Sequence, residues 1–402
     1  MADDAARDWI SAYGGAARTP HIDSLAKSGG GVLGVLFETV WAEPMCTPSR
    51  VQALTGQYPF RTGWLAHHDV PRWGGAGLEL AHSNATTWAR VLRERAGYST
   101  AVAGKWQLHH LAQRPTALDE MGFDEHCVWP GFEAEDKRLH EDSKYWAPVL
   151  QTNGERREYG KEAFGPDLVA NFVVDWIARQ AKAARPWLLF WPMLLCHKPF
   201  TRTPAASGKG KSPAEMRHMA EYMDKLVGRA LAAVDDAGAR ERTVVIFTDD
   251  HGSSKSASLR GLKIPVSAKG QMLDIGVHVP MLVRAPVRIL ADVARARLAP
   301  SERGARATAA LEAADGCLAA RAARDGRVVR TPIASTALLP SIVELGAGSL
   351  ARAAPDAVVD GRSFWPLILV GDRGAFSATA GDGIVFSQCA SKRRPRKSAS
   401  AP

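Results

Sequence analysis

Short apolar runs recur along the chain and are separated by longer segments with helical periodicity. The runs are rich in β-branched and aromatic residues and cover residues 32–41, 100–103, 187–195, 243–248 and 278–284. The helical segments cover residues 19–28, 48–55, 83–95, 167–184, 214–237 and 335–345, and several of them open on Ser, Asp or Pro. This alternation predicts an α/β fold with a mainly parallel sheet flanked by helices. Sites in such folds form where strands end, so polar clusters that follow the apolar runs are the first candidates.

The composition is that of a globular protein. The 402 residues are 46% hydrophobic and 23% charged, which suffices for one large α/β domain or two smaller ones. The net charge is +9, but the last twelve residues hold five Lys or Arg side chains and no acidic one, which leaves +4 for the rest. These five cations have no aromatic residues between them. They therefore indicate a solvated tail, and no nucleic-acid partner is expected.

Cysteine usage and hydropathy exclude several other classes. The five cysteines are scattered and form no Cys-x-x-Cys pair, which argues against a disulfide scaffold and a thiolate zinc site. No apolar run approaches the roughly 18 to 20 residues of a membrane span, and no secretion signal is visible at the start. Residues 291–330 contain 14 Ala and 8 Arg, which predicts a poorly specified surface insertion.

Candidate chemistry begins at Cys46, in the sequence Cys-Thr-Pro-Ser-Arg that ends at Arg50. The segment follows an extended run and opens a predicted helix, where free backbone N–H groups stabilise an anion. A bare cysteine in this position is more often a packed side chain. A reactive role becomes the better interpretation only through the family that the pentapeptide and the residues after it resemble.

Three further polar clusters follow apolar runs. Gly-Lys-Trp-Gln-Leu contains Lys105 and Gln107, Cys-His-Lys-Pro-Phe contains His197, and Phe-Thr-Asp-Asp-His-Gly contains Asp250 and His251. Taken singly, each cluster has an ordinary structural interpretation: a histidine after a strand is more often structural, and an acidic turn is as often generic as it is a binding motif. Carboxylates grouped at strand ends are, however, the ligands that a hard cation requires.

In their order along the chain these motifs resemble the sulfatase family. The match includes Cys-x-Pro-Ser-Arg followed by Ala-Leu-Thr-Gly-Gln-Tyr-Pro at residues 53–59, and Asp3-Asp4 followed by Thr-Pro-His-Ile-Asp-Ser-Leu-Ala at residues 19–26. It also includes Ala-Lys-Gly at residues 268–270 before Val-Pro at 279–280, and Asp-Gly-Arg-Ser-Phe-Trp-Pro-Leu at residues 360–367. The resemblance implies the alkaline-phosphatase-like α/β fold with a metal ion at the sheet edge.

The resemblance also implies roles for individual residues. Cys46 would be oxidised to formylglycine by the formylglycine-generating enzyme, and the cation would be Ca²⁺, with Mg²⁺ as the alternative. The implied catalytic set is Cys46, Arg50, Lys105, His197 and Lys269, with Lys263 as a weaker alternative to Lys269. Lys105, Gln107, His197 and Lys269 would contact the substrate. The implied metal ligands are Asp3, Asp4, Cys46, Asp250 and His251.

The chain departs from the family in three places. Gln107 stands where the family has a histidine, and the neighbouring His109 and His110 are expected at the surface. The first strand of the fold and most of the C-terminal subdomain are expected to be missing, so Asp3 and Asp4 would lie at a terminus, where residues often fray. The predicted division is a catalytic core at 1–290, the insertion at 291–330, the end of the core at 331–372 and the basic tail at 373–402.

The expected function is that of an arylsulfatase-like sulfuric ester hydrolase acting on a small aryl or carbohydrate sulfate. Hydrolysis of phosphonates or phosphodiesters is one alternative, because the same nucleophile and metal serve a tetrahedral phosphorus centre. An inactive, truncated homologue is the other, motivated by Gln107 and by the expected gaps in the fold. The family suggests the secretory pathway or the periplasm, although the chain shows no signal.

Overall fold

The computed structural model describes residues 1–66, 86–131, 141–206, 213–253, 269–297 and 326–369. Its strands are β1 (Val32–Trp41), β2 (Ser99–Lys105), β3 (Glu125–Trp129), β4 (Val149–Thr152), β5 (Glu155–Glu158), β6 (Trp187–Phe190), β7 (Val245–Thr248), β8 (His278–Pro286), β9 (Arg327–Val329) and β10 (Ile333–Ala334). Its α-helices are α1 (Pro20–Asp23), α2 (Cys46–Thr55), α3 (Pro59–Thr62), α4 (Trp88–Ala96), α5 (Ala117–Glu120), α6 (Gly165–Gln180), α7 (Pro213–Asp236), α8 (Asp274–Val277), α9 (Val287–Arg297), α11 (Leu338–Ala347), α12 (Leu350–Ala353) and α13 (Trp365–Leu369).

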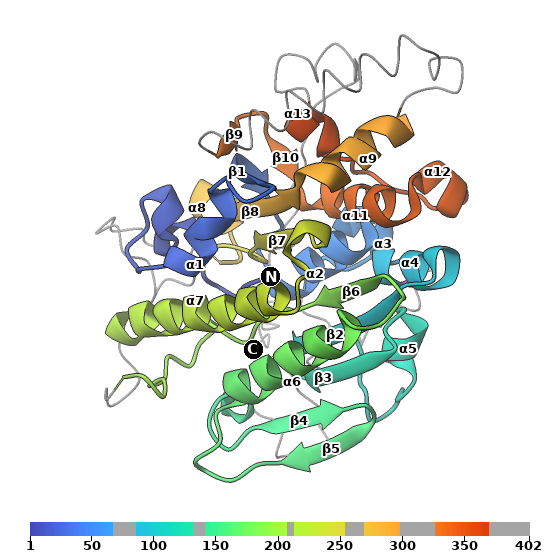
Figure 1. The fold of residues 1–402 in the computed structure, drawn as a ribbon. Helices are drawn as coiled ribbons and strands as arrows, with labels where there is room; N and C mark the ends of the chain where they lie inside the picture. Colours follow the sequence, from blue (N-terminus) through green and yellow to red (C-terminus); the bar gives the residue numbers. More distant parts are fainter. Residues whose placement is uncertain (67–85, 132–140, 207–212, 254–268, 298–325, 370–402) are drawn as a thin grey trace, which may run out of the picture.

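The described strands form two mixed sheets (Figure 1). One has the order β10-β1-β8-β7, with β9 also paired to β1, and the other has the order β5-β4-β3-β2-β6. Parallel pairings join β2 to β3 and β6, whereas β8 runs antiparallel to both β1 and β7. Because β1 and β7 share this antiparallel neighbour, their carboxyl ends lie at the same edge of the sheet. The parallel pairings expected from the sequence are therefore present beside antiparallel ones.

The first three residues join the two sheets. The Ala2 N–H donates to the Thr248 carbonyl at 2.7 Å, and the Asp3 N–H donates to the Leu195 carbonyl at 3.0 Å. The Met193 N–H in turn donates to the Met1 carbonyl at 2.8 Å. The chain start is thus held between the end of β7 and the segment that follows β6. It is paired on both sides, where the sequence had suggested a frayed terminus.

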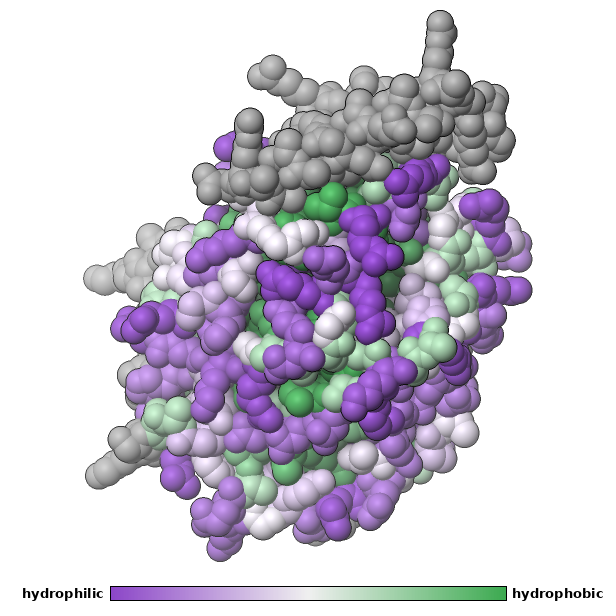
Figure 2. All heavy atoms as spheres, viewed as in Figure 1, coloured by the Kyte–Doolittle hydropathy of each residue, from purple (hydrophilic) through white to green (hydrophobic). Residues whose placement is uncertain are grey.

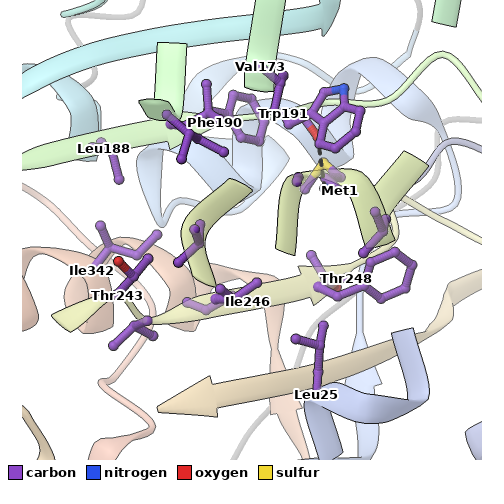
Figure 3. A pocket seen from close by; sticks show the side chains of 18 of the residues that line it. Met1, Leu25, Val173, Leu188, Phe190, Trp191, Thr243, Ile246, Thr248 and Ile342 are labelled. Carbon is purple, nitrogen blue, oxygen red and sulfur yellow. Dashed lines mark hydrogen bonds between the residues drawn. The ribbon is translucent and has the colours of Figure 1, made fainter. Parts of the chain in front are cut away.

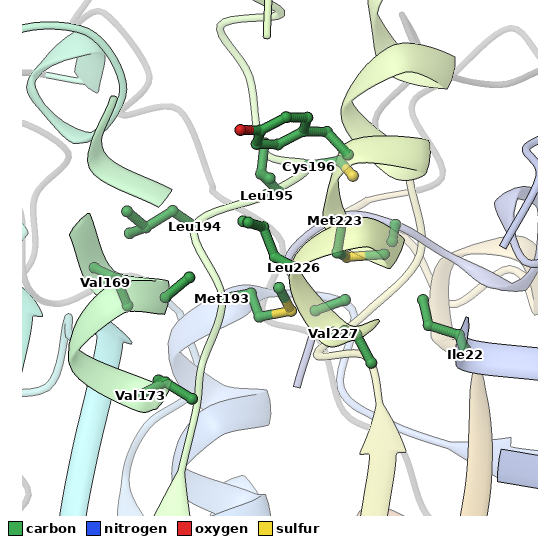
Figure 4. Close-up of a cluster of buried hydrophobic side chains, with 14 of the residues drawn as sticks. Ile22, Val169, Val173, Met193, Leu194, Leu195, Cys196, Met223, Leu226 and Val227 are labelled. Carbon is green, nitrogen blue, oxygen red and sulfur yellow. The ribbon is translucent and has the colours of Figure 1, made fainter. Parts of the chain in front are cut away.

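Helices cover both faces of the sheets. On one face, α6 and α7 pack their apolar stripes around residues 193–195, as Figure 4 shows for Val169, Val173, Met223 and Leu226. On the other, α4 and α11 pack against β2 and β3. The helix α4 shows why the sequence folds in this way, because Thr87 caps its first turn by accepting from the Arg90 N–H, and the left-handed Gly97 ends it.

Most predicted elements occur with shifted ends. The strand at residues 32–41 has the predicted bounds, whereas β6 stops at Phe190 because the following residues leave the β2 pairing and bind Met1 and Asp3 instead. The Ala/Arg-rich stretch contributes both of its ends to the fold, since α9 extends to Arg297 and β9 pairs with β1. Residues 298–325, Lys263 and the basic tail from residue 373 lie outside the described residues.

Polar residues cover most of the face seen in Figure 2, with smaller apolar areas between them. None of the described helices has the length and hydropathy needed to cross a membrane.

Candidate active site

The site is centred on Cys46, the first residue of α2. The chain reaches this position from the end of β1, and the thiol is fully buried. Its Sγ lies 3.0 Å from His251 Nε2 and 3.2 Å from Lys269 Nζ. A buried thiol at a helix N-terminus, surrounded by cationic groups, is a favourable place for negative charge.

The charges around Cys46 make the thiolate accessible. Burial alone would raise the pKa of the thiol, but Lys105, Lys269 and His251 together lower it well below its usual value. A hydrogen bond from His197 acts in the same direction. The environment therefore stabilises an anion at the position of the sulfur.

Arg50 lies one helical turn after Cys46 and organises the carboxylates. Its guanidinium donates to Asp250 Oδ2 from Nε at 3.1 Å and from Nη2 at 2.9 Å. The same Nη2 lies 3.3 Å from Asp3 Oδ1. All three side chains are buried, so Arg50 fixes two acidic groups relative to one another and to the start of α2.

The segment after β7 supplies the next three side chains. Asp249 accepts hydrogen bonds from the N–H groups of Ala6 at 2.5 Å and Asp250 at 2.8 Å, which ties the chain start to this turn. Burial and the charge of Asp250 raise the pKa of Asp249 well above its usual value. Opposing the effect of burial, His251 and Arg50 lower the pKa of Asp250. Adjacent carboxyl groups thus have separate tasks, with Asp249 holding the backbone and Asp250 facing the site.

His251 presents its Nε2 atom to the charged cluster. Its Nδ1 lies 2.8 Å from the Gly252 carbonyl, which fixes the proton on Nδ1 in the neutral ring. Nε2 lies 3.2 Å from Asp4 Oδ1 and 3.6 Å from Asp250 Oδ1. Burial opposes protonation, but Asp250 and Cys46 raise the pKa of His251 to about 10.

Asp3 and Asp4 are both buried, which corrects the expectation of fraying at the terminus. Lys105, the last residue of β2, donates to both oxygens of Asp3 at 2.9 and 2.8 Å. Lys269 donates to Asp4 Oδ1 at 2.7 Å. Asp4 has a φ of 62°, a left-handed conformation that aspartate tolerates better than most residues. The backbone contacts of residues 1–3 supply the support that the sequence did not reveal.

His197 approaches from the segment after β6, and a lysine that the sequence did not single out lies behind it. Lys144 Nζ is 2.9 Å from His197 Nδ1 and 2.9 Å from the Lys198 carbonyl. The Lys144 side chain is fully buried beside the rings of Trp129 and Tyr145. Burial and the nearby ammonium groups, Lys144 first, lower the pKa of His197 well below its usual value. The only sequence signal for Lys144 is its place in an aromatic cluster, which does not identify its partner.

The remaining candidates are less closely tied to Cys46. Gln107 is buried near Gly131, and its Oε1 has no hydrogen-bond partner within the described parts of the chain. His109 is also buried and stacks on Trp106 with ring centroids 5.8 Å apart, so the expectation of a surface position was wrong for this residue. His110 is half-buried. The stack on Trp106 gives His109 a packing role.

The site residues fit a hard divalent cation. Asp3, Cys46, Asp250 and His251 each offer a donor atom within 4.8 Å of the others, and so do Asp3, Asp4, Cys46 and His197. Asp4 Oδ2 is buried without a hydrogen-bond partner among the described residues, which leaves one carboxylate oxygen available. Three carboxylates are the donor chemistry that Ca²⁺ and Mg²⁺ prefer. The sequence-implied ligands therefore converge in space, and His197 joins them.

A family model and a curated relative that match this chain are both described as sulfatases. A family model described as Sulfatase matches residues 1–314. The steryl-sulfatase of Mus musculus is 28% identical over 445 residues, covering 92% of this chain and 64% of that protein. The chain thus spans less than two thirds of the length of this relative.

Solved structures agree on the fold. One reported as "Crystal structure of Ps i-CgsB", also solved in complex with k-i-k-neocarrahexaose, has a TM-score of 0.69 at 20% identity and covers 92% of this chain and 75% of its own. The phosphonate monoester hydrolase of Agrobacterium radiobacter has a TM-score of 0.58 at 17% identity, covering 92% and 76%. At these identities the likeness establishes the fold alone. The expected alkaline-phosphatase-like α/β class is thereby confirmed.

Proposed function

The chain belongs to the sulfatase family, and from this premise we propose that it hydrolyses sulfate monoesters with a formylglycine made from Cys46. The observation that carries the proposal is the set of groups around the Cys46 sulfur. His251 Nε2 and Lys269 Nζ lie 3.0 and 3.2 Å from it, and two overlapping groups of donor atoms share Asp3 and Cys46, one with Asp4 and the other with Asp250. This is an arrangement for binding a cation and an anionic ester beside one reactive side chain.

A formylglycine suits this place because its hydrated aldehyde offers two hydroxyl groups, one to attack sulfur and one whose deprotonation later releases the sulfate. A plain thiol would attack once and leave an adduct with no such exit. Conversion of the thiol to the aldehyde is an oxidation, which the formylglycine-generating enzyme would carry out during maturation. The buried, cation-rich position of Cys46 would stabilise the oxyanion of the hydrate.

Asp3, Asp4, Asp250 and His251 are the residues that would hold a calcium ion, or alternatively magnesium, and a bound ion would draw the sulfate oxygens towards the nucleophile. Lys105 and Lys269 pair with Asp3 and Asp4. Both ammonium groups lower the pKa of Cys46, so both lie where they would attract an anionic sulfate beside that residue. Arg50 stays on Asp250 and keeps the carboxylates in place.

His197 is assigned to hydrogen bonding with the substrate. Two groups lie at its Nδ1, the Lys144 ammonium at 2.9 Å and the Lys198 carbonyl at 2.6 Å. In the tautomer in which Nδ1 accepts from Lys144, the opposite ring nitrogen, Nε2, carries the proton that can be donated to a sulfate or ester oxygen. The lowered pKa of His197 supports this role of a neutral donor over that of a cationic acid. Gln107 is assigned a weaker supporting contact, since an amide can donate a hydrogen bond but cannot shuttle a proton.

The test is mass spectrometry of the peptide that contains Cys46, on the full chain made in a host with the formylglycine-generating enzyme. We expect a mass lower by about eighteen daltons, the change from thiol to aldehyde, and release of sulfate from 4-nitrophenyl sulfate. Cys46→Ala should lose the activity, whereas Cys127→Ala, at another buried cysteine, should keep it. An unmodified thiol in a competent host, or no sulfate release after proven oxidation, would contradict the proposal.

The second candidate function is phosphonate or phosphodiester hydrolysis, favoured by the structural likeness to a phosphonate monoester hydrolase. The comparison is between 4-nitrophenyl sulfate and 4-nitrophenyl phenylphosphonate under identical conditions. A higher kcat/KM for the phosphonate would replace the first proposal with this one. If the oxidised protein binds calcium but hydrolyses neither ester, it would instead be an inactive homologue, the alternative suggested by Gln107 in place of the family's histidine.

For the natural substrate we propose an aryl, steryl or carbohydrate sulfate. The name of the relative arylsulfatase D supports the first, that of the relative steryl-sulfatase supports the second, and the oligosaccharide complex of a structural neighbour supports the third. For the compartment we propose the secretory pathway or the periplasm, which membership of the family suggests.

A further inference from the structure

Of the charged side chains in the site, that of Lys269 is the most exposed. It is 13% exposed, whereas the side chains of Asp3, Asp4, Arg50, Lys105, Asp250 and His251 are exposed by 2% or less. His197 is intermediate at 8%. A substrate that reaches Cys46 from solvent therefore passes Lys269. Its sulfate enters first, and its alcohol part stays on the outer side of this lysine.

The segment that follows Lys269 is exposed and carries two large apolar side chains. Residues 271–274 are exposed, and within them Met272 and Leu273 are 48% and 40% exposed. In the described part of the chain, the other large apolar side chains with comparable exposure are Phe60, Val328 and Val358. A single exposed apolar residue needs no explanation. Two in succession beside a polar site indicate a binding surface.

Backbone hydrogen bonds fix this segment at both ends. The Gly270 N–H donates to the Pro44 carbonyl at 2.8 Å, two residues before Cys46. At the other end, the Leu273 carbonyl accepts from the Gly276 N–H at 2.7 Å in the first turn of α8. The segment is thus attached to the start of the helix that carries the nucleophile. An apolar surface held in this way is ordered before a ligand binds, which lowers the entropic cost of binding.

The turn at Gly270 brings Met45 to the same surface. Gly270 has a φ of 80°, in the left-handed region that favours glycine, and a Cβ at this position would lie 3.3 Å from Met45 Sδ. Met45, the residue before the nucleophile, is half-buried. From Lys269 to Met272 the chain covers at most roughly 11 Å, because successive Cα atoms are about 3.8 Å apart. We call Met45, Met272 and Leu273 the apolar rim.

A separate apolar space lies between β6 and β7. It is a channel of about 240 Å³, and Figure 3 shows Leu188 and Phe190 on one side of it and Ile246 on the other. Among the described residues that line the channel, none belongs to the apolar rim, to the implied catalytic set or to the implied metal ligands. The channel therefore shares no residue with the place where the sulfate would bind, whereas the apolar rim begins three residues after Lys269.

Methionine and leucine side chains suit an apolar alcohol. Their thioether and methyl groups make dispersion contacts with rings and aliphatic carbon, and they donate no hydrogen bond. A carbohydrate hydroxyl placed against them would lose its hydrogen bonds to water without replacement. The apolar rim thus favours one class of alcohol and disfavours the other.

We propose that the apolar rim binds the alcohol part of the substrate, and that the chain prefers sulfate esters of apolar, ring-containing alcohols over carbohydrate sulfates. This inference rests on the proposed sulfatase function and narrows its substrate class. Met272 and Leu273 are the specificity-determining residues, and Lys269 holds the sulfate end.

The test measures the binding of two esters that differ in the polarity of the alcohol: cyclohexylmethyl sulfate and glucose 6-sulfate, both primary esters on a six-membered ring. Calorimetry is done on the full, calcium-loaded chain with Cys46→Ala, which removes the proposed nucleophile. We expect cyclohexylmethyl sulfate to bind at least about tenfold more tightly. Adding Met272→Gln and Leu273→Gln should weaken its binding about 5- to 10-fold and leave that of glucose 6-sulfate unchanged, because the lost contacts are apolar.

The control is Val358→Gln, at an exposed apolar residue outside the apolar rim, which should bind both esters like the parent. All three substitutions are at exposed positions, so Tm should stay unchanged. Unchanged binding of cyclohexylmethyl sulfate in the Met272 and Leu273 variant would overturn the proposal. Equal weakening of both esters would do so as well, and so would tighter binding of glucose 6-sulfate by the parent or no binding of cyclohexylmethyl sulfate.

Turnover of 4-nitrophenyl sulfate by the oxidised parent reports on the proposed function separately. If the parent releases sulfate but the Met272 and Leu273 variant binds both esters as the parent does, the function stands and the role of the apolar rim is refuted. If no ester is hydrolysed but the variant weakens cyclohexylmethyl sulfate alone, the proposed hydrolysis fails and the role of the apolar rim is supported.

Discussion

Replacing Arg50 with methionine should destabilise the protein strongly, because the guanidinium balances two buried carboxylates. The substitution keeps an unbranched side chain of similar length and removes the charge. Asp3 would keep Lys105 at 2.8 Å. Among the described residues, the Asp250 side chain would keep the Asp4 N–H at 3.3 Å and the more distant His251 at 3.6 Å. The loss therefore falls on Asp250, a buried anion deprived of two hydrogen bonds from one cation.

The size of the effect follows from that geometry. Breaking a buried ion pair by removing one partner costs about 3–5 kcal/mol, since the other charge remains buried and poorly compensated. The control is Arg90→Met, which removes an arginine from an ion pair with Glu94 whose two side chains are 51% and 43% exposed. An exposed pair of this spacing contributes about 0.3–0.5 kcal/mol. The two variants thus compare the same chemical change in buried and solvated surroundings.

Thermal and urea unfolding of the metal-free chain, followed by tryptophan fluorescence, measures both variants. We expect the Arg50 variant to unfold at a clearly lower temperature and urea concentration, and the Arg90 variant to match the parent within about 0.5 kcal/mol. Equal behaviour of the two variants would refute the reasoning, because it would mean that Asp250 needs no buried cation.

Three other predictions address the site. Lys144→Met should reduce kcat/KM for an aryl sulfate by about 10- to 100-fold, mainly through a higher KM, because His197 loses the cation that orients it; an unchanged KM would speak against this positioning role. Saturating Ca²⁺ should raise Tm of the parent but not of Asp250→Asn, with about 2.7 kcal/mol of stabilisation at one hundred times Kd. His251 has a folded pKa of about 10, above its unfolded value, so its contribution to stability is complete below about pH 6.5 and is lost as the pH rises through 10. In metal-free protein, His251→Asn should therefore flatten the fall in Tm across that range.

The positions of the candidate residues after strands could be predicted from the sequence because local patterns carry that information. The run at residues 32–41 forms β1 with the predicted bounds, and Cys46 opens the following helix. Lys105 ends β2, and Asp250 follows β7. The carboxyl ends of parallel strands meet at one edge, so residues with this placement tend to gather. Their convergence around Cys46 follows from the fold class.

Other features depended on contacts between distant segments. Lys144 and His197 are 53 positions apart, and no periodicity connects them. The burial of Asp3 and Asp4 results from pairing with Thr248 and Leu195. A separation of 243 positions likewise hides the role of Asp249, whose carboxylate accepts a hydrogen bond from the Ala6 N–H.

By itself, the sequence determined the α/β class, the order of the motifs and the side chains available for chemistry. It could do so because the hydrophobic pattern of neighbouring residues indicates strands and helices. Only the tertiary structure decided which charges face one another: Arg50 against Asp250, Lys269 against Asp4, and Lys144 against His197. It also decided that β6 and β7 have a channel between them. Ion pairs and cavities depend on distances of a few ångströms between segments far apart in the chain, and packing of the whole molecule sets those distances.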